Sequence, residues 1–149
     1  MILVDDTVVT MAGSTLKKLS VADGSTVASA AMDASTSYGS TPPLYADGYI
    51  FCQLNGGKVQ AFNAKTLESL WVYTDENSGQ AQSPIAYSDG KVYVGFGYGK
   101  EYAFVCLNAN DGSLVWRKTD SQGYYWANPV GVRIAVGLYP HRGIQRGAP

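Results

Sequence analysis

Short apolar runs separated by turn residues fill most of the first 120 residues. In SDGKVYVGFGYGKEYAFVCLNANDGSLVW, residues 88–116, runs rich in Tyr, Val and Phe alternate with Asp-Gly or glycine-rich segments. Such runs favour β-strands, and an Asp-Gly pair between two of them is a strong hairpin signal, because a type I′ turn needs positive φ at both central positions. The pattern predicts strands over 84–88, 91–96, 102–108 and 114–119.

The same pattern occurs earlier in the chain. Residues 42–73, PPLYADGYIFCQLNGGKVQAFNAKTLESLWVY, repeat it with a spacing of 42 residues between Asp47 and Asp89 and of 45 between Trp71 and Trp116. A degenerate copy fills the first 33 residues and has Ala28 at the tryptophan position. Four short strands in a repeat of about 40–45 residues are typical of a β-propeller blade.

The repeat predicts an all-β chain of propeller blades, each a four-stranded antiparallel sheet. We expect three blades over about 1–33, 42–75 and 84–120, with the first strand of a fourth ending near residue 131. Residues 132–149 lack the expected Asp-Gly turn, hold no acidic residue, and are predicted to be an irregular tail outside the repeat. Because propellers close with about four to eight blades, we expect an incomplete ring, a fragment of a larger propeller.

Residues 61–71, AFNAKTLESLW, and 106–116, CLNANDGSLVW, resemble the quinoprotein-type (PQQ-like) β-propeller repeat, whose signature is Ala-x-Asp-x-x-Thr-Gly-x-x-x-Trp. The lead-in DGKVYVG at 89–95 also fits, whereas Leu67 replaces the motif glycine. The resemblance implies that the tryptophan packs between adjacent blades. We expect the repeated positions to serve turns and blade packing; they are Asp47, Gly48, Ala61, Asn63, Trp71, Asp89, Gly90, Asn108, Asp111, Gly112 and Trp116.

Composition and charge narrow the choice of partners. Charged residues are 15% of the chain and the net charge is −1, which gives no reason to expect nucleic acid. No apolar run approaches the roughly 20 residues that span a bilayer, and the first residues lack a basic export signal. Cys52 and Cys106 are predicted to be buried core residues, although a disulfide between them is left open.

No residue pattern indicates catalysis. Quinone-dependent dehydrogenases of the resembled family typically use an adjacent cysteine pair and converging carboxylates around a quinone and calcium, but Cys52 and Cys106 lie 54 residues apart. The one histidine, His141, falls in the tail. We interpret GFGYGKE at 95–101 as a hairpin turn, and DENSG at 75–79 as an exposed inter-blade loop rather than a calcium loop. No catalytic, cofactor-binding or metal-binding residue is therefore expected, and no cofactor.

Tyr124, Tyr125 and Trp126 in GYYWANP are speculative ligand contacts, and the alternative is that they pack against a neighbouring blade. The preferred hypothesis is a non-catalytic binding or scaffold module of a larger envelope or secreted protein. Its location would be extracellular or in the cell envelope, and its partners an unknown protein or surface ligand and the remaining blades of a parent propeller. The alternative hypothesis is a fragment of a quinone-dependent dehydrogenase.

Overall fold

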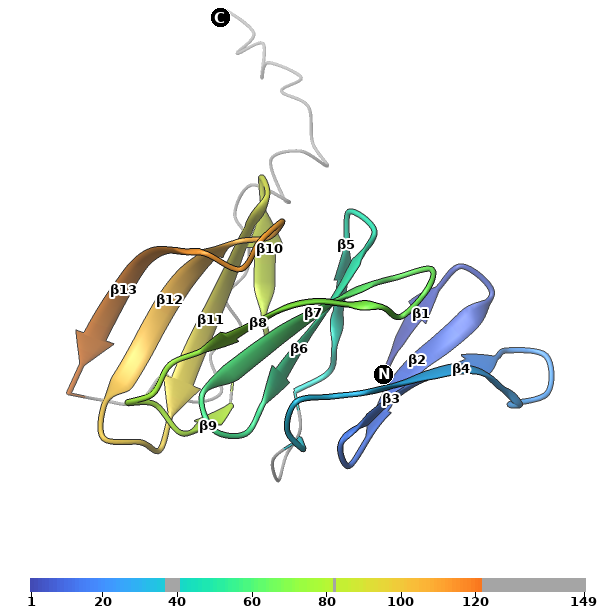
Figure 1. The fold of residues 1–149 in the computed structure, drawn as a ribbon, viewed down its shortest axis with the longest axis horizontal. Helices are drawn as coiled ribbons and strands as arrows, with labels where there is room; N and C mark the ends of the chain where they lie inside the picture. The colour runs from blue at the N-terminus through green and yellow to red at the C-terminus, as the bar shows by residue number, and fades with distance from the viewer. Residues whose placement is uncertain (37–40, 82, 122–149) are drawn as a thin grey trace, which may run out of the picture.

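The chain forms three antiparallel sheets that follow one another along the molecule (Figure 1). The structure is a computed structural model that describes residues 1–36, 41–81 and 83–121. The first sheet contains β1 (Ile2–Val4), β2 (Thr7–Ala12), β3 (Thr15–Ser20) and β4 (Thr26–Ala31). The second contains β5 (Leu44–Ala46), β6 (Tyr49–Leu54), β7 (Lys58–Asn63) and β8 (Ser69–Thr74). The third contains β10 (Ala86–Ser88), β11 (Lys91–Gly97), β12 (Tyr102–Asn108) and β13 (Leu114–Asp120), and the short β9 (Gln80–Ala81) pairs with β11.

The three sheets are structural copies of one another. In each, the four strands lie in chain order, and the pairing of the last two strands shifts register at one equivalent point. The shift follows Lys18 in β3, Ala61 in β7 and Cys106 in β12. The predicted all-β class of four-stranded blades is therefore confirmed, and the described residues form an unclosed row of blades.

Two hairpins show why the Asp-Gly pairs appear where they do. Asp47 and Gly48 have φ values of 48° and 79°, and Asp89 and Gly90 have 48° and 68°. Positive φ at both central positions matches the right-handed twist of the flanking strands, and Asp and Gly tolerate it better than other residues. The GFGYGKE segment joins β11 to β12 as the predicted hairpin.

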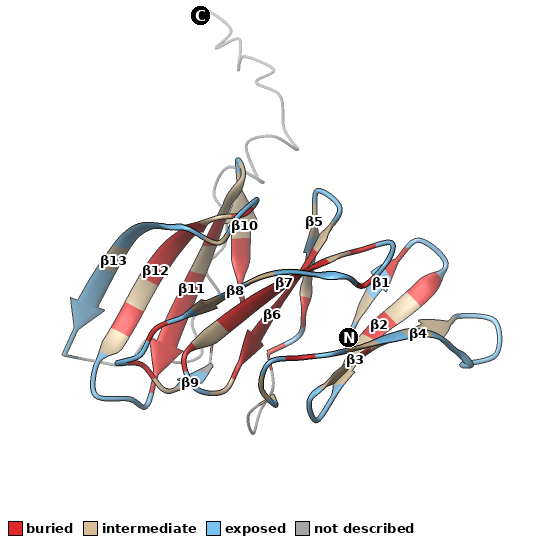
Figure 2. Ribbon diagram, in the orientation of Figure 1, coloured by how far each residue is buried: buried red, intermediate tan, exposed pale blue. Residues whose placement is uncertain are grey.

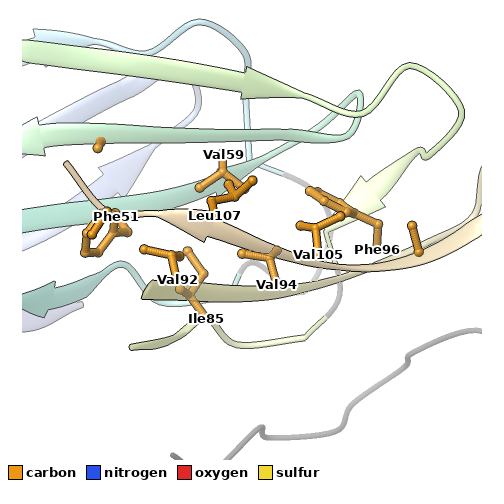
Figure 3. Packing of buried hydrophobic residues seen from close by; sticks show 11 residues of the cluster. Phe51, Val59, Ile85, Val92, Val94, Phe96, Val105 and Leu107 are labelled. Atoms are coloured by element: carbon orange, nitrogen blue, oxygen red, sulfur yellow. The ribbon is translucent and has the colours of Figure 1, made fainter. Parts of the chain in front are cut away.

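The hydrophobic core lies between neighbouring sheets. Alternate residues of β6 point in opposite directions, so Ile50 belongs to the cluster shared with the first sheet and Phe51 to the cluster shared with the third. Figure 3 shows the second of these clusters, in which Phe51 and Val59 meet Val92 and Leu107. The two inner strands of the middle sheet, β6 and β7, are thus buried on both faces, and β6 is a nearly continuous apolar run. Figure 2 shows the opposite situation in β13, which is mostly exposed.

Both cysteines are free and buried, as expected from the sequence. Burial raises the pKa of the Cys52 thiol to about 12, which makes it an inert core residue. In the part of the chain that the structure describes, no helix is long and apolar enough to cross a membrane. The predicted fourth-blade strand, the tail over 132–149 and His141 lie outside the described residues.

Candidate functional site

The repeated motif residues meet at the junctions between sheets. At the second junction, the indole Nε1 of Trp71 on β8 donates a hydrogen bond of 2.8 Å to the carbonyl oxygen of Ala109 in the third sheet. The ring lies against Gly112, which has a φ of 72°. A Cβ atom on Gly112 would stand 2.5 Å from Cε3 of Trp71, closer than any side chain tolerates. A glycine is therefore required here both by its backbone conformation and by the tryptophan.

At the first junction a lysine takes the donor role of the tryptophan. Ala28 occupies the tryptophan position, and its cross-strand neighbour is Lys18, just as Ala61 is the neighbour of Trp71. The Lys18 side chain is buried, and its Nζ donates a hydrogen bond of 2.7 Å to the carbonyl oxygen of Ala64. Ala64 is the counterpart of Ala109, 45 residues earlier. The same backbone acceptor is thus satisfied by a different side chain.

The first junction also carries a bulky residue where the motif has glycine. Leu67, the counterpart of Gly112, keeps the positive φ, at 58°, and is only 3% exposed. It belongs to the apolar cluster against which Ala28 packs. Leu67 therefore occupies space that a tryptophan at position 28 would need. The motif has a large tryptophan on one side of the junction and a small glycine on the other. Here the sizes are exchanged, with the small Ala28 at the tryptophan position and the large Leu67 at the glycine position.

Converting the first junction to the chemistry of the second needs three substitutions together. We expect Lys18→Ala, Ala28→Trp and Leu67→Gly to destabilise the chain individually by about 1–3 kcal/mol, through a lost hydrogen bond, overpacking and a cavity, respectively. The triple variant should be at least about 2 kcal/mol more stable than the sum of the single effects predicts, because the new indole fills the space that the other two changes open. Urea denaturation of the three single variants and the triple variant measures this difference. If the three single losses of unfolding free energy simply add up in the triple variant, the side chains at positions 28 and 67 do not compensate for each other.

A tyrosine joins the Asp-Gly turns of two sheets. The Tyr87 hydroxyl on β10 donates a hydrogen bond to the Asp47 carboxylate and accepts one of 3.2 Å from the backbone N–H of Gly90. Its ring stacks on Phe51 with 6.0 Å between centroids. Burial, followed by the adjacent Asp47 carboxylate, raises the pKa of Tyr87. This side chain therefore stays a neutral donor that fixes the second sheet to the third.

On the opposite edge, Asp75 forms a buried ion pair between sheets. Arg117 on β13 donates from Nε to Oδ2 of Asp75 at 2.7 Å and from Nη2 to Oδ1 at 3.1 Å, and Nη2 lies 2.8 Å from Oε2 of Glu101. The Asp75 side chain is 3% exposed, and Ser78 is buried as well. The prediction of an exposed loop at 75–79 is therefore wrong at these two positions, because the third sheet covers them.

The ion pair sets the electrostatics of this edge. Burial would raise the pKa of Asp75, but the hydrogen bonds and positive charge of Arg117 outweigh it, and the pKa lies below its usual value. Burial and the Asp75 carboxylate raise the pKa of Tyr73 to about 12. Asp75 is therefore a permanently charged structural anion at neutral pH, with its charge matched by Arg117.

The remaining motif residues lie in turns or on the open face of the third sheet. Asn63 caps its turn, with Oδ1 accepting from the backbone N–H groups of residues 65 and 66. In the third sheet Asn108 donates to Ser113 instead, and Asp111 accepts from the Ser113 backbone. Trp116 contacts Tyr93 and Phe104 on the outward face of the sheet. Tyr124, Tyr125 and Trp126 lie outside the described residues.

The described residues do not fit a quinone–calcium site. Within 1–36, 41–81 and 83–121, no group of three or more His, Cys, Asp or Glu side chains converges. Cys52 and Cys106 are buried on separate sheets, so they cannot form an adjacent pair. An open groove of about 490 Å³ lies on the Asp-Gly edge between the second and third sheets, lined by Asp47, Asn63 and Lys65 among others.

Sequence reasoning missed Lys18 and the pair of Asp75 and Arg117. A signal was present for the pair, because the two residues are separated by 42 residues, close to one repeat, and so face each other across a junction. For Lys18 the signal was a lysine at the position of Ala61, in the one repeat that lacks tryptophan. Both signals can be interpreted only when successive repeats are known to form sheets that pack against each other.

Comparisons with known proteins agree with this architecture. The family described as outer membrane protein assembly factor BamB matches residues 2–123. No match among the curated proteins is significant. Solved structures of similar fold include BamB from Moraxella catarrhalis (16% identity, TM-score 0.61, 76% of this chain and 33% of that one). A europium-containing methanol dehydrogenase is 18% identical with a TM-score of 0.65, and the match covers 80% of this chain and 24% of that one. The quinohemoprotein alcohol dehydrogenase from Comamonas testosteroni is 17% identical with a TM-score of 0.66, and the match covers 79% of this chain and 20% of that one.

These structures include two enzymes and a BamB protein, whose family is described as an assembly factor, so they show the fold and do not distinguish catalysis from binding. The chain spans a third or less of the length of each of them. The resemblance to the PQQ-like repeat is confirmed by the family match and by the propeller neighbours. The chain is a segment of a PQQ-like β-propeller and belongs to the family described as outer membrane protein assembly factor BamB.

Proposed function

We propose that this chain is a non-catalytic propeller segment that acts as a binding and scaffold module, within a larger protein of the cell envelope or a secreted protein. The observation that carries the proposal is that the motif residues make contacts between sheets. Trp71 and Gly112 join the second sheet to the third, and Asp75 with Arg117 joins the same two sheets at the opposite edge. The side chains that the repeat supplies at this junction thus hold neighbouring blades together.

The groove at the Asp-Gly edge is the surface that we propose for binding. Its lining mixes the charges of Asp47 and Lys65, the amides of Asn63 and Asn110, and the apolar side chain of Leu70. This mixture suits a peptide segment, which presents backbone amides and apolar side chains together. A protein partner also agrees with the name of the matched family, which describes an assembly factor. The remaining blades of a parent propeller would extend the same row.

The experiment that tests the absence of catalysis is a titration with quinone and calcium. We expect the full 149-residue chain to leave the absorbance spectrum of pyrroloquinoline quinone unchanged in the presence of Ca²⁺, and to reduce no dye when ethanol is added. The physical reason is that the described residues offer no converging carboxylates for the ion and no adjacent cysteine pair for the quinone.

A quinone-dependent alcohol dehydrogenase, stripped of its cofactor and assayed in the same buffer, is the positive control. A saturable spectral change with this chain, at one quinone per chain, would overturn the proposal. It would favour the alternative function, a fragment of a quinone-dependent dehydrogenase, which is supported by the likeness in fold to the two alcohol-oxidising enzymes.

A further inference from the structure

The turn that joins β6 to β7 contains an asparagine followed by a glycine, Asn55-Gly56, a pair that occurs once in the chain. Asparagine is a thermolabile residue. It reacts most readily before glycine, because no side chain hinders attack of the next backbone nitrogen on its side-chain carbonyl carbon. Gly56 is exposed, and no atom lies within 4 Å of where its Cβ would be, so water reaches this turn. The turn therefore has the sequence and the solvent access that spontaneous loss of a side-chain amide requires.

Two hydrogen bonds hold Asn55 to the loop that follows the first sheet. Its backbone N–H donates to the carbonyl oxygen of Ser35 at 3.0 Å, and its Nδ2 donates to Oγ of Ser35 at 3.2 Å. Ser35 comes shortly after β4, in the segment that leads from the first sheet to the second. The nitrogen that deamidation would release is thus bound to a residue from the neighbouring sheet.

The other end of the turn is fixed to the loop after the second sheet. The backbone N–H of Gly57 donates to the carbonyl oxygen of Gly79 at 2.6 Å, and its own carbonyl accepts from the backbone N–H of Asp75 at 2.8 Å. A Cβ on Gly57 would collide with the Asp75 carbonyl oxygen, so the two backbones are in direct contact. Because Gly57 is fixed, Asn55 is the end that must move when its side chain meets the Gly56 nitrogen. That movement requires Asn55 to leave Ser35.

The reaction products fit this position less well than asparagine does. Among the described residues, no donor reaches Oδ1 of Asn55, which is buried. An aspartate there lacks the N–H that binds Ser35 and places a charged oxygen where no donor meets it, which is costly. Isoaspartate, the other product, also adds a carbon atom to the main chain next to the pairing of Leu54 with Lys58. Either product weakens the contact between the first two sheets.

We propose that Asn55 is a deamidation site, protected by Ser35 while the first and second sheets are in contact and released when they separate, so that the reaction makes the separation irreversible. The Gly56 nitrogen gives its proton to hydroxide and bonds to Cγ of Asn55. The Cγ–Nδ2 bond breaks, and Nδ2 takes a proton from water and leaves as ammonia. Water then adds to one of the two carbonyl carbons of the five-membered imide and opens it to aspartate or isoaspartate. This inference does not rest on the binding function proposed above.

Peptide mapping by mass spectrometry tests the proposal on the full chain, incubated at mildly alkaline pH. We expect Asn55 to deamidate in the folded chain at least about tenfold more slowly than in the urea-unfolded chain, because only molecules with the contact open react. Ser35→Ala should raise the rate in the folded chain at least about threefold by removing one hydrogen bond. Ser14→Ala, at the exposed turn between β2 and β3, is the matched control and should not change it.

Two junction variants distinguish separation of the first sheet from unfolding of the whole chain. Lys18→Ala removes a hydrogen bond at the first junction, and Gly112→Ala overpacks the second. We expect Lys18→Ala to accelerate deamidation of Asn55 more than Gly112→Ala does, although it costs no more stability, with equal rates for both in urea. Ser35 is exposed, so Ser35→Ala keeps the test open should Lys18→Ala fail to fold.

The effect of the product is measured with Asn55→Asp, which has the sequence of the aspartate form. Its urea midpoint should be lower than that of the wild type, whereas Asn110→Asp, which adds the same charge at an exposed residue of the third sheet, should leave the midpoint nearly unchanged. Four results would each overturn the proposal: no conversion of the folded chain, equal rates in the folded and unfolded chains, a rate unaffected by Ser35→Ala, or equal acceleration by the two junction variants. An unchanged midpoint in Asn55→Asp would overturn the irreversible step.

Discussion

Replacing Gly112 by alanine is expected to lower the free energy of unfolding by about 3 kcal/mol. Two costs combine. An alanine at a φ of 72° loses about 1–2 kcal/mol relative to glycine. Its Cβ would lie 2.5 Å from Cε3 of Trp71, an overpacked contact that costs a further 1–3 kcal/mol or so. The indole cannot retreat easily, because its Nε1 is held by Ala109. Urea denaturation followed by circular dichroism measures the loss.

Gly90→Ala is the matched control. Gly90 has a φ of 68° with no atom within 4 Å of a Cβ, so this variant suffers the backbone cost alone, about 1–2 kcal/mol. In a Trp71→Ala background, where the ring is gone, the cost of Gly112→Ala should fall to that of the control. An equal cost for Gly112→Ala and Gly90→Ala in the wild-type background would show that the ring is not packed as described.

The blades and their turns could be predicted from the sequence because the signals are local. Each Asp-Gly pair lies between the two strands it connects, so Asp47 and Asp89 mark hairpins without knowledge of anything distant. The repeat spacing then places equivalent strands on successive sheets. The strand alternation is obscured in β6, where both faces are buried and the sequence is apolar at nearly every position.

The junction chemistry could not be predicted in the same way, because it depends on which turn meets which strand. Ala28 and Leu67 each look like a lost motif residue, and only the packing of the first sheet on the second shows that one compensates for the other. The 75–79 segment is polar and lies between two blades, which predicts exposure. Asp75 is buried because Arg117, from the following sheet, supplies a charge that the local sequence does not contain.

Arg117→Ala is expected to destabilise the fold by about 3 kcal/mol at pH 7. The substitution leaves the Asp75 carboxylate buried, with a side-chain exposure of 3%, and without its two charged hydrogen bonds. Removing one partner of a buried pair typically costs 3–5 kcal/mol, and the partial exposure of Arg117 places this pair at the lower end. Glu101→Gln removes only the exposed partner and should cost about 0.5 kcal/mol.

A double-mutant cycle with Asp75→Asn identifies the source of that loss. Asp75→Asn alone should cost less than Arg117→Ala, because the arginine left behind is partly exposed and still has Glu101. Arg117→Ala in the Asp75→Asn background should cost about 1 kcal/mol or less, since no buried charge remains to be stranded. If Arg117→Ala costs the same in both backgrounds, its effect comes from lost packing of its stem and not from the carboxylate.

The pH dependence of Arg117→Ala separates the stranded charge from every other cause. In the wild type the pKa of Asp75 is lowered in the folded state, so its stabilisation is present above the unfolded-state value of about 4 and is lost as the pH falls through the folded-state value. Without Arg117, we expect burial to outweigh the remaining hydrogen bonds, including that from the backbone N–H of Asn77, and to raise the folded-state pKa of Asp75, so the variant is least stable at neutral pH and recovers as the carboxylate is protonated. The difference in unfolding free energy between wild type and variant should therefore shrink by about 1 kcal/mol or more between pH 7 and pH 4. The same comparison in the Asp75→Asn background should be flat, and a flat profile in both backgrounds would contradict a buried anion held by Arg117.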